Sequence, residues 1–205
     1  MNRRKTVIIA ASILYGLFFF WYTNFGGPIS KQEIAAAVDG LRENGLTDER
    51  IEVWKGFMET DTGNQFIMLN NLDMNPAPPK MPKTPDDATA QDLMDVYMEH
   101  MYPELLKRAS HPIFFGQAVH QALDVEGIEN ASSWSHGALF RYRSRADLIE
   151  IALNPQSKDR HEYKIAALTK TIAYPVKPTL YLSDPRLLLF LILTSLVSIV
   201  LIIRK

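Results

Sequence analysis

The feature that most constrains this chain is a pair of uncharged apolar stretches, one near each end. Residues 6–23 contain no charged side chain, and residues 187–203 are equally uncharged and apolar. A helix of about 20 apolar residues crosses the roughly 30 Å hydrocarbon core of a bilayer. A cleaved signal peptide is the alternative for the first stretch, but that stretch is long, ends in an aromatic cluster and lacks an A-x-A-like cleavage site. We therefore expect an uncleaved anchor there and a second membrane span near the C-terminus.

Basic residues lie just outside both predicted spans. Residues 3–5 read Arg-Arg-Lys, and residues 204–205 read Arg-Lys. Because the cytoplasmic flanks of membrane spans carry an excess of Lys and Arg, we expect residues 1–5 and 204–205 to be cytoplasmic tails. Two spans then place the intervening chain outside the cytoplasm. We interpret the chain as a bacterial inner-membrane protein whose main domain is periplasmic.

Each predicted span also carries two small residues four positions apart. These are Ser12 and Gly16 in the first span and Thr194 and Ser198 in the second. Small residues at this spacing let two helices approach closely in a membrane. We therefore expect the two pairs to pack against each other.

The region between the tails is acidic and free of cysteine. Five of the 22 Lys and Arg residues lie in the tails, which leaves 17 against 23 Asp and Glu, a net charge of −6. This balance argues against a nucleic-acid partner and against a polybasic attachment to anionic lipid. The lack of cysteine excludes disulfides, thiol catalysis and Cys-based metal sites. No P-loop, dinucleotide-binding glycine turn or nucleophile elbow occurs either.

Between the spans, the pattern predicts a helical collar over residues 24–62 and one α+β domain over residues 63–183. A capping-box pattern at residues 30–33 opens the first collar helix. Residues 65–74 are apolar and bounded by turn residues, which is typical of a strand. A proline-rich loop follows over residues 75–87. We expect this loop to be a stiff connector, with a lid or a docking segment as the alternatives.

The rest of the domain alternates between helical and strand patterns. We predict a helix, two strands, a second helix interrupted at Asn154-Pro155, and a last strand that suits a sheet edge, over residues 88–110, 111–127, 134–143, 144–170 and 171–182. The order strand, helix, strand, strand, helix, strand is the ferredoxin-like βαββαβ arrangement. The expected fold class is therefore α+β, with this domain between two transmembrane helices.

The two central strands are expected to pair about a turn near residue 128. This pairing sets His120 opposite His136, on a mixed face with Trp134 and Tyr142. The other face is apolar: Ile113, Phe115, Val119, Leu123 and Leu139. We expect the helices to cover the apolar face, and a second copy of the chain to cover the mixed face.

The element order and two stretches of sequence, residues 102–119 and 138–155, resemble the dimeric α+β-barrel superfamily. That superfamily includes antibiotic-biosynthesis-type monooxygenases and haem-degrading oxygenases, and the resemblance covers roughly residues 65–182. It implies a homodimer in which the mixed sheet faces line a pocket. If the protein is an enzyme, the resemblance implies a monooxygenase-like oxidoreductase without a tightly bound cofactor.

In the haem-degrading branch, a first-strand Asn, a third-strand Trp and a second-helix His surround the haem. The matching positions in this sequence are Asn71, Tyr142 and His161. The Tyr departs from the family pattern, and a periplasmic domain is separated from cytoplasmic reductants. We therefore expect no cofactor, and haem is the alternative.

His161 shares a helical stripe with Ile165 and Leu168, so we expect it to point inward. A hydrogen-bonded structural histidine is the alternative to a functional one. The expected pocket residues are Asn71, His120, Trp134, His136, Tyr142 and His161, and the candidate catalytic residues among them are His161, Tyr142 and Asn71. Two histidines without a carboxylate do not define a metal site, so none is expected.

These observations lead to two functional hypotheses. In the first, a two-span membrane protein contacts lipid through its spans, forms a homodimer, and binds, and in one version oxidises, a small apolar or aromatic molecule. In the alternative, the protein is a non-catalytic scaffold or accessory subunit of a larger membrane complex.

Overall fold

The computed structural model describes residues 3–203. It divides into two compact units, one formed by the terminal segments up to Gly26 and from Pro178, the other by Gly27–Lys177. The basic residues Arg204 and Lys205, on which part of the predicted orientation rests, lie outside the described residues.

The terminal unit consists of two apolar helices, α1 (Arg3–Tyr22) and α7 (Pro185–Ile203). Both are long and apolar enough to cross a membrane. Almost none of their surface is buried by protein, which is the pattern of a helix that faces lipid. The prediction of two helices of membrane-spanning length, one near each end, is confirmed.

α1 and α7 contact each other through large side chains. The rings of Tyr15 and Phe190 meet edge to face, with their centroids 5.8 Å apart. Gly16 has open space where a Cβ would stand. The hydroxyls of Thr194 and Ser198 are exposed and donate to carbonyls of their own helix, at 2.7 Å and 2.8 Å. The predicted contact between the small-residue pairs is therefore wrong, because Ser12, Thr194 and Ser198 are exposed and Gly16 has no close neighbour.

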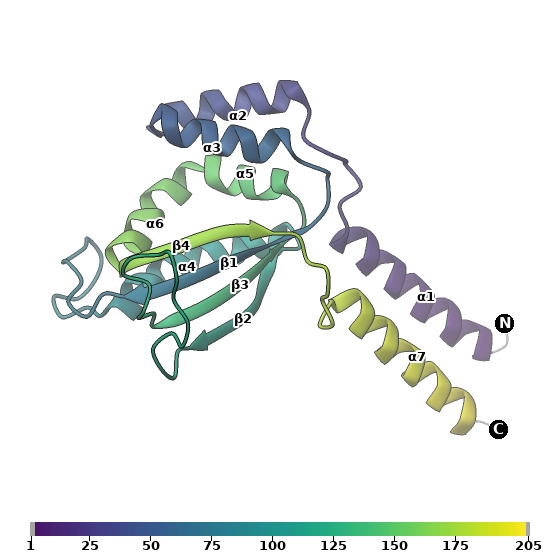
Figure 1. Ribbon diagram of the computed structural model, residues 1–205. Helices are drawn as coiled ribbons and strands as arrows, with labels where there is room; N and C mark the ends of the chain where they lie inside the picture. The colour runs from purple at the N-terminus through teal and green to yellow at the C-terminus, as the bar shows by residue number, and fades with distance from the viewer. Residues whose placement is uncertain (1–2, 204–205) are drawn as a thin grey trace. The chain divides into compact units, whose positions relative to one another are not determined.

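The Gly27–Lys177 unit is built around a four-stranded antiparallel sheet (Figure 1). Its strands are β1 (Phe66–Met74), β2 (His111–Gln117), β3 (His136–Tyr142) and β4 (Leu168–Val176). They lie in the order β2-β3-β1-β4. The last strand is at an edge, as its prolines predict, because proline has no N–H to donate to a neighbouring strand.

Helices cover one face of this sheet in two layers (Figure 1). The inner helices are α4 (Ala90–Lys107), α5 (Arg145–Leu153) and α6 (Pro155–Ala166). The outer pair, α2 (Lys31–Glu43) and α3 (Asp48–Glu59), packs on α5 through a small apolar cluster. The two helices predicted as a collar thus belong to the same compact unit as the sheet.

Local side-chain caps define where these helices begin. α2 opens with the predicted capping box, in which the Glu33 N–H donates to Ser30 Oγ and the Ser30 N–H donates to the Glu33 carboxylate. α5 ends at Leu153, and α6 starts with Pro155 at its first position, where a missing N–H costs nothing. The predicted interruption at Asn154 is confirmed.

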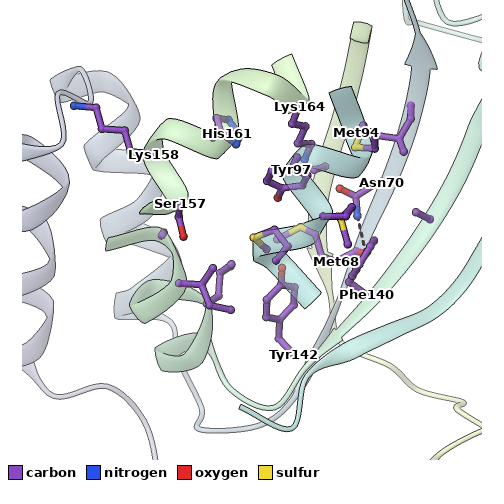
Figure 2. A pocket seen from close by; sticks show the side chains of 18 of the residues that line it. Met68, Asn70, Met94, Tyr97, Phe140, Tyr142, Ser157, Lys158, His161 and Lys164 are labelled. Carbon is purple, nitrogen blue, oxygen red and sulfur yellow. Dashed lines mark hydrogen bonds between the residues drawn. The ribbon is translucent and has the colours of Figure 1, made fainter. Parts of the chain in front are cut away.

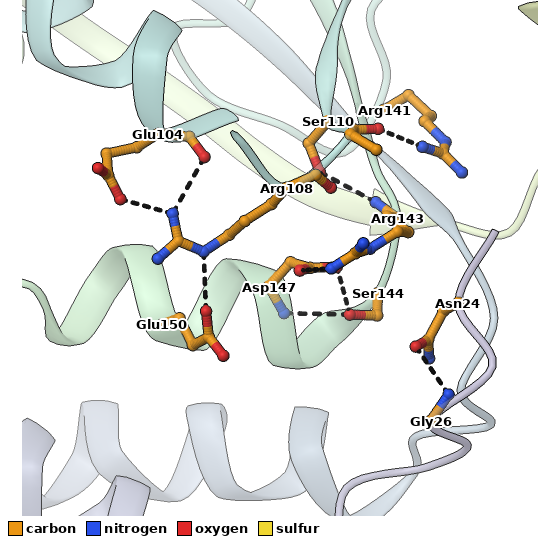
Figure 3. A network of polar contacts seen from close by, with 11 residues as sticks. Asn24, Gly26, Glu104, Arg108, Ser110, Arg141, Arg143, Ser144, Asp147 and Glu150 are labelled. Carbon is orange, nitrogen blue, oxygen red and sulfur yellow. Dashed lines mark hydrogen bonds and ion pairs between the residues drawn. The ribbon is translucent and has the colours of Figure 1, made fainter. Parts of the chain in front are cut away.

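A polar network attaches the start of α5 to the sheet (Figure 3). The Arg143 guanidinium pairs with the Asp147 carboxylate at 2.6 Å, and the Ser144 hydroxyl donates to the same carboxylate at 2.6 Å. The Arg143 backbone N–H donates to Ser110 Oγ at 3.1 Å. The residues that cap α5 therefore also hold it against the loop between α4 and β2.

The predicted pairing of the two central strands is wrong. His136 pairs with Gln117 rather than with His120, a displacement of three positions. β2 ends at Gln117, and the connection to β3 is longer than the predicted turn. Because successive side chains of a strand point to opposite faces, an odd displacement exchanges the faces of one strand relative to the other.

The predicted assignment of faces is wrong for β3. Tyr142 stacks on Phe66 with ring centroids 5.1 Å apart, and both belong to a buried cluster with Leu105 of α4 and Leu148 of α5. On β3, the face predicted to be uncovered is therefore the one under the helices, whereas on β2 Phe115 faces the helices as predicted. Both faces of β3 carry apolar side chains, so alternation alone does not show which face the helices cover.

The uncovered face of the sheet is apolar as well. It carries Leu69, Phe114, Leu139, Ile172 and Tyr174, which share one side through the pairing of β1 with its neighbours. Phe114 is 54% exposed and Tyr174 is 44% exposed. An apolar patch of this kind is typical of a surface that meets a partner.

Candidate functional site

A cavity of about 420 Å³ lies inside the Gly27–Lys177 unit, between the covered sheet face and the helices. β1 contributes Met68 and Asn70 to it, and β3 contributes Phe140 (Figure 2). Helices α4, α5 and α6 form the opposite walls, and Trp54 of α3 also lines the cavity. The cavity is thus assembled within one chain.

Most of the lining is apolar and adaptable. Four methionines line the cavity: Met68, Met94, Met98 and Met101. Unbranched thioethers adjust to the shape of what they contact and pack well against aromatic rings. Tyr97 and Tyr142 add two such rings, and Figure 2 shows the Tyr142 hydroxyl directed into the cavity.

Both tyrosines are phenols that stay neutral. Burial raises the pKa of Tyr97 to about 12. Burial, with a smaller contribution from Tyr97, raises the pKa of Tyr142 as well. At neutral pH each hydroxyl therefore keeps its proton and can donate a hydrogen bond to a molecule in the cavity.

α6 presents a polar stripe to the same cavity. Ser157, His161 and Lys164 recur at i, i+4 and i+7, which places them on one side of the helix. The apolar stripe predicted to orient His161 does not exist: Ile165 is 54% exposed, and Leu168 is the first residue of β4. The prediction that this helix continues to Lys170 is wrong, because the chain turns at Ala167 and enters the sheet.

His161 lies at the open side of the cavity. Its ring meets the Tyr97 ring edge to face, with centroids 6.3 Å apart. The residue as a whole is exposed, but neighbouring atoms of the protein partly desolvate the imidazole. This burial, together with the charges of Lys164 and Arg50, lowers the pKa of His161. The neutral imidazole is therefore favoured.

Lys164 places a cation against the aromatic lining. Its Nζ lies 5.7 Å from the centroid of the Tyr97 ring, within reach of a cation–π contact. Burial lowers the pKa of Lys164. The loss of hydration thus disfavours the charged form of Lys164.

The structure brings two of the predicted pocket residues, Tyr142 and His161, into one cavity. Asn71 points to the uncovered sheet face, because it pairs with Gly137 and Ile172. Its neighbour Asn70 lines the cavity instead, with its amide donating to the Met68 carbonyl at 3.1 Å.

The other three predicted residues lie outside the cavity. His136 stacks on Phe115, with centroids 5.2 Å apart, and it is Phe115 that reaches the cavity. Trp134 lies under the Lys170 ammonium, whose Nζ is 4.8 Å from a centroid of the indole. His120 is exposed in the connection between β2 and β3. No group of three or more potential metal ligands occurs within residues 3–203.

Sequence reasoning missed several residues of this cavity. Lys164 lies three positions after His161, so a helical projection of polar residues would have found it. Arg50 and Trp54 belong to a helix that is distant in sequence, and only the packing of α3 brings them to the cavity.

No protein-family model matches this chain, and no curated protein matches it in sequence. Among solved structures, the RPA0582 protein of unknown function from Rhodopseudomonas palustris is similar, with 20% identity, a TM-score of 0.52, and coverage of 66% of this chain and 96% of that chain. Methylated RPA0582 is similar to the same degree, with 19% identity, a TM-score of 0.53, and coverage of 68% and 96%.

A dimeric ferredoxin-like protein of unknown function from Jannaschia sp. matches with 16% identity and a TM-score of 0.33, over 56% of this chain and 100% of that chain. The similarity to RPA0582 is at the level of fold alone. The antiparallel four-stranded sheet and its helical layer make the Gly27–Lys177 unit a mixed α+β fold (Figure 1).

Proposed function

We propose that this chain is a two-span membrane protein whose α+β domain binds a small apolar or aromatic molecule between the sheet and the helices. The observation that carries the proposal is the cavity of about 420 Å³, lined by thioethers and aromatic rings with a few polar groups. Small-molecule sites typically have volumes of about 300–1,000 Å³ and the same balance of lining.

The proposed topology places both termini in the cytoplasm and the domain in the periplasm of a bacterial inner membrane. Two apolar helices of sufficient length support it, as do the basic residues outside them. The net charge of −6 between the tails suits a domain that is held away from anionic lipid.

We further propose that two copies pair through the uncovered sheet face. Phe114, Ile172 and Tyr174 are each more than two-fifths exposed there, and burying them would remove an apolar patch from water. In such a dimer each copy keeps its own cavity on the other side of the sheet.

Oxidation of the bound molecule enters the proposal only through the resemblance to monooxygenases. Of the candidate catalytic residues, Tyr142 and His161 reach the cavity, and Asn71 faces away from it. The lining supports the binding of a small molecule, and haem is one of the ligands to be tested.

The test is to purify the full chain in mild detergent and analyse what accompanies it. A small apolar or aromatic molecule detected by mass spectrometry supports the proposal. The cavity-filling variant Ala152→Phe should lose that molecule, whereas Ala36→Phe, the same change at an exposed position, should keep it. A stoichiometric protein partner, with no molecule in either variant, would favour the scaffold instead.

A further inference from the structure

The cavity carries positive charge that no carboxylate of the described chain neutralises. Arg50 of α3 and Lys158 and Lys164 of α6 all line it, and none of them forms an ion pair within residues 3–203. His161, which is also part of the lining, gains a positive charge when it is protonated. Arg50 and Lys158 are exposed to water, whereas Lys164 is partly buried, and a buried cation is costly unless a counter-charge accompanies it.

The acidic side of the lining is a single residue. Asp95 of α4 is the one carboxylate among the lining residues, and its Oδ1 accepts a hydrogen bond from Gln91 Nε2 at 2.7 Å. No ion pair within residues 3–203 joins Asp95 to Arg50, Lys158 or Lys164. The lining therefore has a surplus of positive charge.

The basic residues of the lining come from α6 and α3. Lys158 and His161 are three positions apart on α6, and so are His161 and Lys164, which makes them neighbours on the helix surface. Arg50 approaches from α3, close enough for its charge and that of Lys164 to act on the His161 imidazole. Figure 2 shows His161 and Lys164 on α6 facing the other labelled lining residues, and the Lys158 ammonium directed away from them.

The opposite side of the cavity is apolar. Met68 lies on β1, Met98 on α4 and Tyr142 on β3, and none of them carries a charge at neutral pH. In Figure 2 Met68 and Tyr142 lie across the cavity from α6. The cavity is therefore divided into a cationic edge and an apolar body.

We infer that the ligand is an amphipathic anion, a carboxylate with an apolar or aromatic body. This inference rests on the proposed function, because it assigns a ligand class to the same cavity. The carboxylate lies at the α6 edge, where Lys164 and Arg50 donate charge-assisted hydrogen bonds, and the body packs among the thioethers. The ligand thereby supplies the counter-charge that the chain lacks.

The experiment compares two probes that differ only in charge, naphthalene-2-carboxylate and naphthalene-2-carboxamide. Each is titrated calorimetrically into the full chain in non-ionic detergent, with detergent alone as the blank. The carboxylate is expected to bind at least about tenfold more tightly than the carboxamide. Arg50→Gln, a change at an exposed position, should reduce this preference without disturbing the core, and the double variant with Lys164→Gln should abolish it.

Lys107→Gln is the matched control, because Lys107 is exposed, lies in the last turn of α4 and is not part of the cavity. It should leave the preference unchanged. Equal affinity for the two probes, with both displaced by Ala152→Phe, would overturn the anion inference and leave the proposed function standing. Failure of both probes to bind would overturn both.

Discussion

Replacing Lys164 by Met should stabilise the empty protein. The ammonium is partly buried beside the Tyr97 ring, and no carboxylate of the described chain pairs with it. Burial lowers the pKa of Lys164 from its ordinary value of 10.5, so the folded state disfavours the charged form. Methionine keeps most of the side-chain volume and removes the charge.

The magnitude follows from two opposed contributions. Losing the cation–π contact costs about 0.5–1 kcal/mol, and up to about 2 kcal/mol if the contact is desolvated. Releasing a poorly solvated polar group returns about 1–3 kcal/mol. Because the second contribution exceeds the first over most of these ranges, we expect a net gain of roughly 1 kcal/mol, or about 2–4 °C in Tm for a unit of this size.

The assay is thermal unfolding of the ligand-free full chain, with Lys107→Met as the control. Both lysines lie in the last turn of a helix, so the loss of a favourable charge at a helix C-terminus is common to the two variants. The gain from Lys164→Met should be present at neutral pH and shrink as the pH rises toward 10.5, because the folded state then releases the proton first. A larger loss of stability for Lys164→Met than for Lys107→Met would refute the reasoning.

Four further outcomes are expected. Leu105→Ala, at a fully buried position, should lower the free energy of unfolding by about 2–5 kcal/mol in denaturant titrations. Folding lowers the pKa of His161, so the unfolded state binds a proton at this imidazole first as the pH falls. Wild type should therefore lose stability relative to His161→Gln below pH 6.5. Parallel curves of stability against pH for the two proteins would contradict this. Phe114→Glu should shift the sedimenting species from dimer to monomer while the far-UV spectrum is retained. Reporters fused after Asp87 should be active only outside the cytoplasm, and reporters at the C-terminus only inside.

Lys164 is expected to have opposite effects in the empty and the ligand-bound protein. An unpaired ammonium in an apolar cavity lowers the stability of the empty protein, and the same ammonium attracts an anion of matching shape. Sites that bind ligands often retain interactions that are unfavourable without the ligand. The unfolding experiment therefore measures what the Lys164 ammonium does without a ligand, and the probe experiment measures what it does with one.

The candidate site was predictable only in part. Tyr142 and His161 were predicted and do reach one cavity, but the reasons given for them were wrong, since Ile165 is exposed and the helices cover the opposite face of β3 from the one expected. Asn71 and Asn70 illustrate why. These neighbours on β1 face opposite sides of the sheet, so a shift of one position moves a side chain from the cavity to the uncovered face. The pattern of apolar residues did not show which of the two faces the cavity.

Features set by neighbouring residues were determined by the sequence itself. The apolar spans, the capping box at Ser30, the interruption at Asn154-Pro155 and the order of strands and helices depend on contacts a few residues apart. These contacts form in nearly any tertiary context, so they can be read along the chain.

The register of β2 on β3, the face that the helices cover and the cavity itself were decided only by the tertiary structure. Gln117 rather than His120 meets His136 because the chain leaves the sheet earlier than the turn pattern suggested. Arg50 reaches the cavity because α3 packs on the inner helices. Such contacts join segments far apart in the chain, and their energies depend on how whole faces fit together, which no local pattern records.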